Sequence, residues 1–227
     1  MTTTLITGAN RGLGYETARR LIADGHDVWM AARDPERGRR AADELGGRFV
    51  RLDVTDDASV AAAVDTVGEL DVLVNNAGIV GNRKAVEDMT ADDVRLVYET
   101  NVFGVVRVTQ AFVPLLERSG NPVIVNVSSG MGSIAVTSDP ERLESTLVSL
   151  AYPSSKTALN MLTSQWAKAL PGMRVNCVDP GYTATDFNDH RGTQTVEEGA
   201  EQIVRMAELD RSGPTGTFSD RHGAVPW

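Results

Sequence analysis

The sequence predicts a doubly wound α/β domain, in which helices cover both faces of a mostly or fully parallel sheet of about seven strands. Two observations support this prediction. Short aliphatic and β-branched runs alternate with helical stretches along the chain, and most of these runs are continuously apolar. A strand that is buried on both faces shows such a run, whereas apolar and polar residues alternate in a strand with one face exposed to solvent. No repeat, linker or change of composition divides residues 1–227, which we expect to form one domain.

The predicted elements follow one another in the order strand, helix, strand. Strands are expected at the apolar runs 4–7, 27–32, 48–52, 71–75, 122–127 and 174–178, with a weaker run at 217–218. Helices are expected where apolar residues recur at helical spacing, over residues 14–24, 35–45, 57–67, 91–116, 154–170 and 196–208. Each helix would connect the strand before it to the strand after it, which is the connection that parallel strands require.

The composition argues against several classes of protein. The chain has 227 residues, of which 41% are hydrophobic, and a formal net charge of -9, so nucleic acid and anionic membranes are disfavoured as partners. No apolar run is long enough to span a bilayer, and the first residues lack the features of a signal peptide. Cys177 is the single cysteine and cannot form an internal disulfide, so we expect a cytoplasmic protein. The histidines show no metal-ligand spacing, and we expect no bound metal.

A glycine-rich turn follows the first predicted strand, with the sequence TGANRGLG at residues 7–14. In a doubly wound sheet, ligands bind beyond the carboxyl ends of the strands, where this turn would lie. Glycines let the backbone approach a ligand closely, and the next helix offers unpaired N–H groups to a pyrophosphate. The alternative is an ordinary turn, but the position between the first strand and the first helix favours a phosphate-binding loop.

Further motifs lie at or near the ends of later strands. NNAG occupies residues 75–78, Asn101 lies in a predicted helix, NVSS occupies 126–129, YPSSK occupies 152–156, and DPG occupies 179–181. Together with the glycine turn, this ordered set resembles the short-chain dehydrogenase/reductase family, from residue 4 to about residue 186. The resemblance implies a Rossmann-type domain and an oxidoreductase that uses a nicotinamide cofactor. The pattern is similar to that of the carbonyl-reductase-like branch, which prefers NADPH.

The end of the second predicted strand bears on the choice of cofactor. In the family, the acidic residue that selects NAD would fall at Ala32, which cannot hold a ribose hydroxyl. Arg33 follows it and Arg11 lies in the glycine turn, and two guanidinium groups suit the 2′-phosphate of NADP(H). The alternative is that Arg33 is a solvated charge and Asp34 binds the ribose. Asp53 contacts the adenine in the family pattern, or caps the following helix.

The resemblance also implies which residues hold the cofactor. Thr183, mainly through its backbone, and Thr185 are expected to contact the nicotinamide carboxamide, although a Pro-Gly pair before them would alone indicate only a turn. The whole implied set lies at strand ends and in the turns that follow them: Gly8, Asn10, Arg11, Gly12, Leu13, Gly14, Arg33, Asp53, Val54, Asn75, Ala77, Gly78, Tyr152, Lys156, Pro180, Gly181, Thr183 and Thr185.

The same resemblance places the chemistry on Ser129, Tyr152 and Lys156. Reduction of a carbonyl group needs a proton on its oxygen, and the Tyr152 hydroxyl is the candidate donor. A free tyrosine has a pKa of about 10, and Lys156, four residues later on the same helical face, is expected to lower it. Ser129, the second serine of its pair, would hydrogen-bond the substrate oxygen. Asn101 resembles the asparagine that holds a water for proton relay, or else caps a helix distortion.

Two segments depart from the usual family pattern. Ser129 and Tyr152 are 23 positions apart, and the extra residues 137–150 are expected to hold a short helix over 140–144. A larger insertion at this place marks the monomeric carbonyl-reductase branch, so we expect a monomer or homodimer rather than the tetramer common in the family. The segment between Asp186 and Val196 forms the substrate lid in the family. It is short here, which indicates an open, permissive pocket.

These observations predict an NADPH-dependent reductase of a small-molecule carbonyl substrate, which is an aldehyde, ketone or quinone. One alternative is an NAD(P)-dependent secondary-alcohol dehydrogenase that works mainly in the oxidative direction. Cofactor preference discriminates between the two, since NADPH pools usually drive reduction. The other alternative is a non-catalytic NADP-binding sensor, but such a protein would be expected to lose the tyrosine or the lysine that this chain keeps.

Overall fold

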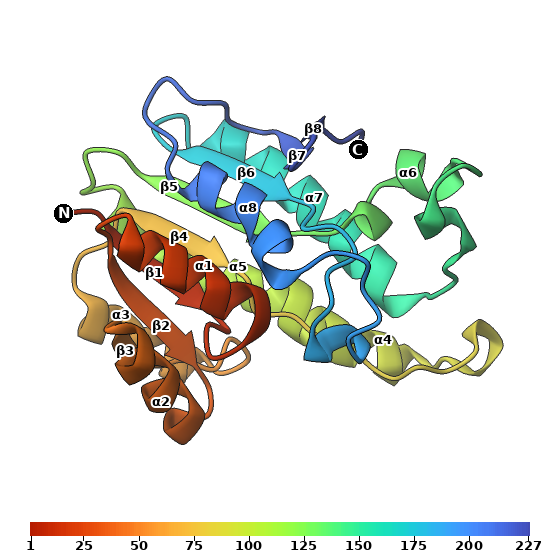
Figure 1. Ribbon diagram of the computed structural model, residues 1–227, viewed down its shortest axis with the longest axis horizontal. Coiled ribbons are helices and arrows are strands. Elements are labelled where there is room, and N and C mark those ends of the chain that lie inside the picture. Colours follow the sequence, from red (N-terminus) through yellow and green to blue (C-terminus); the bar gives the residue numbers. More distant parts are fainter.

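All strands of the protein belong to one sheet in the computed structural model, which describes residues 1–227 (Figure 1). The order of the strands across the sheet is β3-β2-β1-β4-β5-β6-β7-β8. Neighbouring strands are parallel, except for the antiparallel pair of β7 and β8. This arrangement confirms the predicted doubly wound, mostly parallel sheet. The strands are β1 (Thr3–Thr7), β2 (Asp27–Ala32), β3 (Arg48–Arg51), β4 (Val72–Asn75), β5 (Val123–Val127), β6 (Arg174–Val178), β7 (Phe218–Asp220) and β8 (Gly223–Ala224).

The last strand, β8, was missing from the prediction of about seven strands. It is two residues long and pairs with β7 in the registers Ser219 with Ala224 and Asp220 with Gly223. A strand of this length has too few side chains to show any periodic pattern, so the sequence gives no signal for it.

The helices match most of the predicted ranges within a few residues. They are α1 (Gly12–Ala23), α2 (Pro35–Leu45), α3 (Asp57–Val67), α4 (Ala91–Tyr98), α5 (Val105–Leu116), α6 (Ile134–Ser138), α7 (Ala151–Ala169) and α8 (Val196–Ala207). Five of them begin with a side chain that accepts hydrogen bonds from the first-turn N–H groups, which satisfies donors that have no partner inside the helix. These caps are Asp34, Asp56, Thr90, Ser133 and Thr195.

Two local predictions were wrong, and the alternative role of Asp53 as a helix cap is excluded. The long helix predicted over 91–116 is interrupted between α4 and α5 by a π-helical turn, η2 (Glu99–Gly104). No α-helix forms over 140–144, because the backbone at Arg142 is extended, and only a 3-10 turn, η4 (Leu143–Thr146), follows it. Asp53 does not cap α3, since Asp56 does, and the Asp53 carboxylate instead accepts from Thr55.

Two hydrophobic cores lie on opposite faces of the sheet. In β1, Leu5 belongs to the core that α3 and α5 cover, and its neighbour Ile6 belongs to the core that α1, α2 and α8 cover. The same alternation recurs in β4, where Leu73 packs with the first group of helices and Val74 with the second. In Figure 1, α1 and α8 lie in front of the sheet, whereas α5 lies behind it. The covering of both faces explains why the strands are continuously apolar.

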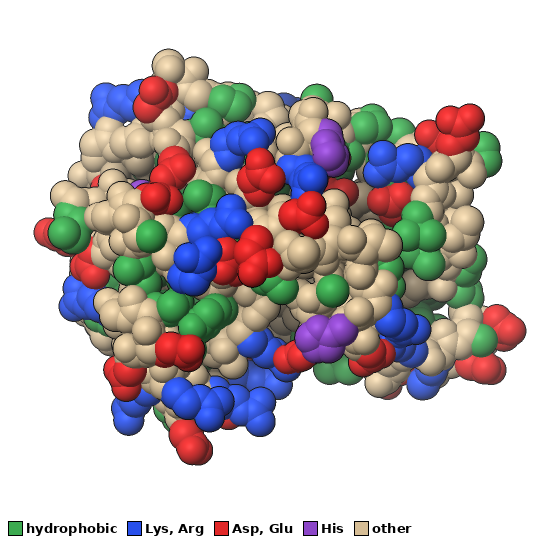
Figure 2. Space-filling view, viewed as in Figure 1, with side chains coloured by type: hydrophobic (Ala, Val, Ile, Leu, Met, Phe, Trp, Pro, Cys, Tyr) green, Lys and Arg blue, Asp and Glu red, His purple; other side chains and the backbone are tan.

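The sheet has a switch point between β1 and β4. The chain leaves β1 towards β2 and β3, then crosses back to place β4 on the other side of β1. The loops after β1 and β4 therefore diverge to opposite faces and leave a crevice at the carboxyl ends of the strands. Acidic and basic side chains are interspersed over the face shown in Figure 2. None of the helices is both long and apolar enough to cross a bilayer.

Candidate active site

A cavity of about 1020 Å³ lies at the carboxyl ends of the strands. The loops after β1 to β6 all contribute to its lining, as the switch-point rule predicts. Of the residues proposed from the sequence, Gly14, Asn75 and Asn101 lie behind the cavity wall. The others line the cavity: Gly8, Asn10, Arg11, Gly12, Leu13, Arg33, Asp53, Val54, Ala77, Gly78, Ser129, Tyr152, Lys156, Pro180, Gly181, Thr183 and Thr185.

The glycine turn is pressed against the turn that follows β4. Gly8 has a φ of +66°, and a Cβ added to it would lie 3.1 Å from the Cα of Ala77. A Cβ on Gly14 would lie 2.5 Å from the Nδ2 of Asn76, which donates a hydrogen bond to the Thr7 carbonyl at 2.9 Å. Side chains at these positions would push the two turns apart, so the glycines are required for packing.

The N-terminus of α1 has no side-chain cap, in contrast to α2, α3, α4 and α8. Arg11 occupies the capping position, makes no capping hydrogen bond, and is followed by no acidic residue in the first turn. The first-turn N–H groups and the positive end of the helix dipole therefore face the cavity without a protein anion. This uncapped helix N-terminus has the chemistry that a pyrophosphate needs.

The other end of the cavity wall carries the residues after β2 and β3. Ala32 is buried, whereas Arg33 is exposed and makes no ion pair. The Asp34 carboxylate accepts hydrogen bonds from Glu36 and Arg37 N–H groups at 3.0 and 3.1 Å, which argues against its alternative role as a ribose ligand. Arg11, the second predicted phosphate ligand, pairs with Asp186 at 3.0 Å.

Asp53 stands beside Arg33 at this end of the cavity. Partial burial would raise the pKa of the Asp53 carboxyl, but hydrogen bonds from Thr55 and the charges of Arg33 and Arg51 together lower it. Asp53 is therefore an anion that can accept a hydrogen bond from an amino group.

Asn75 and Asn101 do not line the cavity, but their hydrogen bonds hold together the elements that form its wall. The Asn75 amide donates to Asn126 at 2.8 Å and to Thr109 at 3.0 Å, and so ties β4 to β5 and α5. Asn101, in the π-helical turn, accepts from the Ile79 N–H and donates to the Ile79 carbonyl, both at 2.9 Å. It also donates to the Ser155 hydroxyl at 3.0 Å, which links the loop after β4 to α7. The water-relay role of Asn101 stays a prediction.

Ser129, Tyr152 and Lys156 come together although 23 positions separate the serine from the tyrosine. Ser129 lies two residues after the end of β5, and its hydroxyl accepts from the Met131 N–H at 3.2 Å. It lies near enough to Tyr152 to lower the pKa of that residue. Lys156 lies one turn after Tyr152 on α7, with its Nζ 5.7 Å from the centre of the tyrosine ring. The neighbouring Ser128 is buried, and its hydroxyl donates to Asn160, so Ser129 is the serine that is free to meet a substrate.

The pKa values of the pair differ from the expectation. Desolvation raises the pKa of Tyr152 above its ordinary value, against the hydrogen bond from Ser129, which lowers it. Burial lowers the pKa of Lys156 to about 8, and its ammonium donates to the Val127 carbonyl at 2.7 Å. The expected net lowering of the Tyr152 pKa is not found, because burial outweighs the stabilisation of the phenolate that a nearby ammonium supplies.

The segment after β6 closes the end of the cavity near Tyr152. The Thr183 side chain is buried and donates back to the Pro180 carbonyl at 3.0 Å, which leaves its backbone as the group for a ligand. Thr185 caps a short 3-10 turn, η5 (Asp186–Asn188). Gly181, at a φ of +70°, lets the chain turn before Thr183.

Asp179, Phe187 and Arg83 are among the cavity residues that the sequence-based prediction did not include. Asp179 is buried, accepts from the Gly181 N–H at 2.9 Å, and has a pKa that burial raises. Its place before Pro-Gly could have marked it as a site residue. Phe187 and Arg83 carry no motif, and their position depends on contacts between distant segments.

Comparison with known proteins gives consistent matches. A family model described as short chain dehydrogenase matches residues 2–195. The (+)-neomenthol dehydrogenase of Arabidopsis thaliana is 34% identical over 281 residues, covering 96% of this chain and 95% of that protein. This alignment is longer than the 227 residues of the chain, so the relative has residues that this chain lacks.

Two solved structures share the fold over nearly their whole length. Salutaridine reductase from Papaver somniferum superposes with a TM-score of 0.84 at 30% identity, covering 97% of this chain and 100% of that chain. The NADPH-bound carbonyl reductase from chicken fatty liver superposes with a TM-score of 0.86 at 30% identity, covering 100% of this chain and 99% of that chain. Both are similar to this chain in fold and in sequence.

Proposed function

The chain belongs to the short chain dehydrogenase family, and on that premise we propose that it is an NADPH-dependent reductase of aldehydes, ketones or quinones. The single observation that carries the proposal is the grouping of Ser129, Tyr152 and Lys156 on a cavity beside an uncapped helix N-terminus. The names of the relatives, a neomenthol dehydrogenase, a salutaridine reductase and a carbonyl reductase, support a reaction between a carbonyl and an alcohol.

Each catalytic side chain has a task at the carbonyl oxygen of the substrate. Ser129 donates a hydrogen bond to that oxygen and stabilises the negative charge that develops there. Tyr152, which is protonated at neutral pH because desolvation raises its pKa, donates the proton. The Lys156 ammonium, one helical turn away, stabilises the phenolate that remains.

The cofactor supplies the hydride when it is bound. Its pyrophosphate would be held by the first turn of α1, its adenosine between Arg33 and Asp53, and its nicotinamide by the backbone around Thr183. Lys156 lines the same cavity, and we expect it to hydrogen-bond the nicotinamide ribose, as the family resemblance implies.

The preference for NADPH rests on Arg33. It is a cation without an ion-pair partner at the adenosine end of the cavity, next to a buried alanine where an acid would select NAD. We expect Arg33→Ala to weaken NADPH binding by about tenfold and NADH binding by less than about twofold, because only NADPH loses a charge-assisted hydrogen bond. Fluorescence titration of both cofactors measures this, with Arg37→Ala, an exposed arginine paired with Asp34, as the control. Equal losses for both cofactors would argue against a 2′-phosphate contact.

The proposal also covers the domain organisation, the location, the partners and the oligomeric state of the enzyme. We assign residues 1–227 to one dinucleotide-binding domain that acts on a small molecule in the cytoplasm. The charge of -9 and the interspersed surface charges disfavour nucleic acid as a partner (Figure 2). A monomer or homodimer is favoured over a tetramer by the inserted segment between Ser129 and Tyr152.

Steady-state kinetics test the proposed function. Consumption of NADPH, and separately of NADH, is measured against a panel of aldehydes, ketones and quinones. Turnover with NADPH well above that with NADH supports the reductase. Faster oxidation of secondary alcohols with the oxidised cofactor, and no cofactor preference, would favour an alcohol dehydrogenase. A rise in Tm with NADPH but no turnover on any member of the panel would instead favour a cofactor-binding sensor.

A further inference from the structure

Phe187 lies against the ring of the proposed proton donor. The centres of the Phe187 and Tyr152 rings are 5.6 Å apart and the ring planes meet at 62°, which is an edge-to-face arrangement. Phe187 lines the same cavity as Ser129 and Tyr152, and 39% of its surface is exposed, although the reaction steps above do not use it. A substrate carbonyl that reaches the Tyr152 hydroxyl must therefore carry its substituents close to the ring of Phe187.

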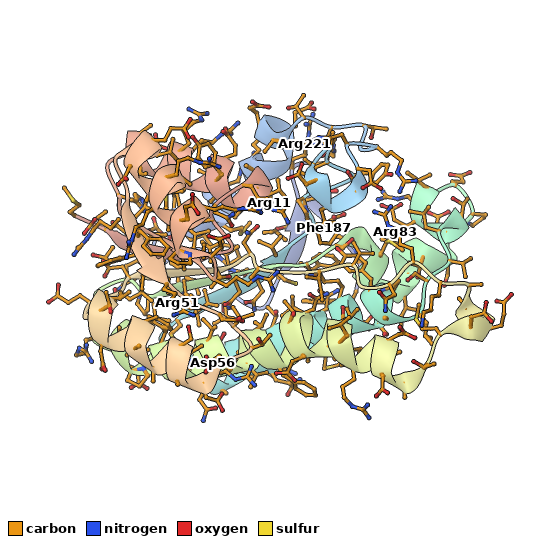
Figure 3. All side chains as sticks on the ribbon, turned by 90° about the horizontal axis from the view of Figure 1, so that it is seen from below. Arg11, Arg51, Asp56, Arg83, Phe187 and Arg221 are labelled. Carbon is orange, nitrogen blue, oxygen red and sulfur yellow. The ribbon has the colours of Figure 1, made fainter.

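Two arginines hold the segment that carries Phe187. Arg11, from the glycine turn, pairs with Asp186 at 3.0 Å. Arg83, from the loop after β4, pairs with Asp189 at 2.5 Å and donates to the Phe187 carbonyl at 3.4 Å. Figure 3 shows Phe187 between the two arginines. These contacts tether the segment on both sides, although each ion pair is exposed to solvent and therefore weak.

Other apolar side chains line the same cavity. Leu143, Leu147 and Val148 come from the inserted segment, and Tyr182 comes from the loop after β6. All four are exposed. Exposed apolar side chains that line a cavity become covered when an apolar group binds, and their burial then adds to affinity.

The charged side chains around this part of the cavity are paired with one another. Asp179, which has no cation partner within salt-bridge distance, is buried and bonded to a backbone N–H group. Apart from the catalytic Lys156, whose ammonium donates to the Val127 carbonyl, no cation here is left without a carboxylate partner for a charged substituent of the substrate. The pairs are Arg83 and Arg191 with Asp189, Lys84 with Asp93, Arg142 with Glu144, and the His190 ring with Asp186.

From these observations we propose that Phe187 is the specificity-determining residue, and that it selects uncharged ketones and aldehydes whose carbonyl carries an apolar ring. This inference rests on the proposed reductase function. The ring of the substrate packs on the Phe187 ring while its carbonyl oxygen reaches Ser129 and Tyr152. Small linear ketones lack this contact, and ring ketones with a carboxylate find no unpaired cation other than Lys156, which the reaction itself uses.

The test compares kcat/KM for acetophenone, 2-butanone and benzoylformate, which are a ring ketone, a small linear ketone and a charged ring ketone. The wild-type enzyme is expected to prefer acetophenone over each of the others by at least about tenfold. Phe187→Ala should lower kcat/KM for acetophenone by about tenfold and that for 2-butanone by less than about twofold, and Phe187→Leu should fall between Phe187→Ala and the wild type. Binding without the cofactor gives a second readout, since acetophenone should raise the Tm of the wild type more than that of Phe187→Ala.

Phe103→Ala is the matched control. Phe103 is also an exposed phenylalanine edge-to-face with a tyrosine, Tyr98, but neither residue lines the cavity. An unchanged ratio of acetophenone to 2-butanone in Phe187→Ala would overturn the inference while the reductase activity stands. Equal use of benzoylformate and acetophenone would overturn it too. If the wild type reduces none of the three ketones, nor any member of the broader panel, with either cofactor, the proposed function itself fails.

Discussion

Tyr152→Phe is expected to lower kcat for carbonyl reduction by about 10³-fold and to change the Kd for NADPH by less than about twofold. The substitution removes one hydroxyl and leaves the aromatic ring against Phe187. The cavity keeps its shape, so the cofactor contacts at α1 and Arg33 are untouched. The loss falls on the chemical step, because the carbonyl oxygen no longer receives a proton from a positioned acid.

The measurement combines single-turnover kinetics with a fluorescence titration of NADPH. Tyr98→Phe is the control, because Tyr98 also contacts a phenylalanine but lies outside the cavity. Turnover by Tyr152→Phe within about tenfold of the wild type would contradict the assignment of the proton donor. A parallel loss of NADPH affinity would mean that the hydroxyl also supports the binding site.

The sheet and the cofactor end of the site could be predicted from the sequence because their signals are local. Leu5 and Ile6 are adjacent and both apolar, which is what a strand between two helix layers requires, and the two residues do pack in different cores. The glycine turn could also be predicted from local sequence. Gly8 and Gly14 lie so close to Ala77 and Asn76 that no side chain would fit, so glycine is required at both positions.

The substrate end could not be predicted in the same way, because contacts between distant segments form it. Arg83 and Phe187 are 104 positions apart, and nothing in either local sequence indicates that the arginine holds the segment of the phenylalanine. The helix expected over 140–144 is replaced by a 3-10 turn from Leu143 to Thr146, although Asp139 accepts from the Glu141 N–H in the same way as the caps of α2 and α3.

The spacing of Tyr152 and Lys156 predicts that their side chains are close, but it does not predict how their pKa values shift. A separation of four residues on a helix places the two side chains on one face, and this proximity is confirmed. Burial by the surrounding chain sets the direction of both pKa shifts, and that burial is a property of the tertiary structure.

Lys156→Met should lower kcat by at least about 10²-fold and raise the Tm of the cofactor-free protein at pH 7 by at least about 2 °C. Lys156 is buried, its pKa falls from 10.5 to about 8, and its one hydrogen-bond partner is the Val127 carbonyl. Below pH 8 the folded protein therefore carries a desolvated ammonium whose pKa is lower than in the unfolded chain, and this destabilises the fold. Methionine has a similar length and no charge, so it removes that cost.

The pH dependence distinguishes this cause from simple packing. Between pH 8 and pH 10.5 the folded protein binds fewer protons at Lys156 than the unfolded chain does, so the penalty shrinks as pH rises through this window. The advantage of Lys156→Met in Tm should therefore be largest at pH 7 and smaller at pH 9.5, as measured by calorimetry. Lys168→Met, on the exposed end of the same helix, should show no such trend. A constant advantage at both pH values would mean that the buried charge is not the cause.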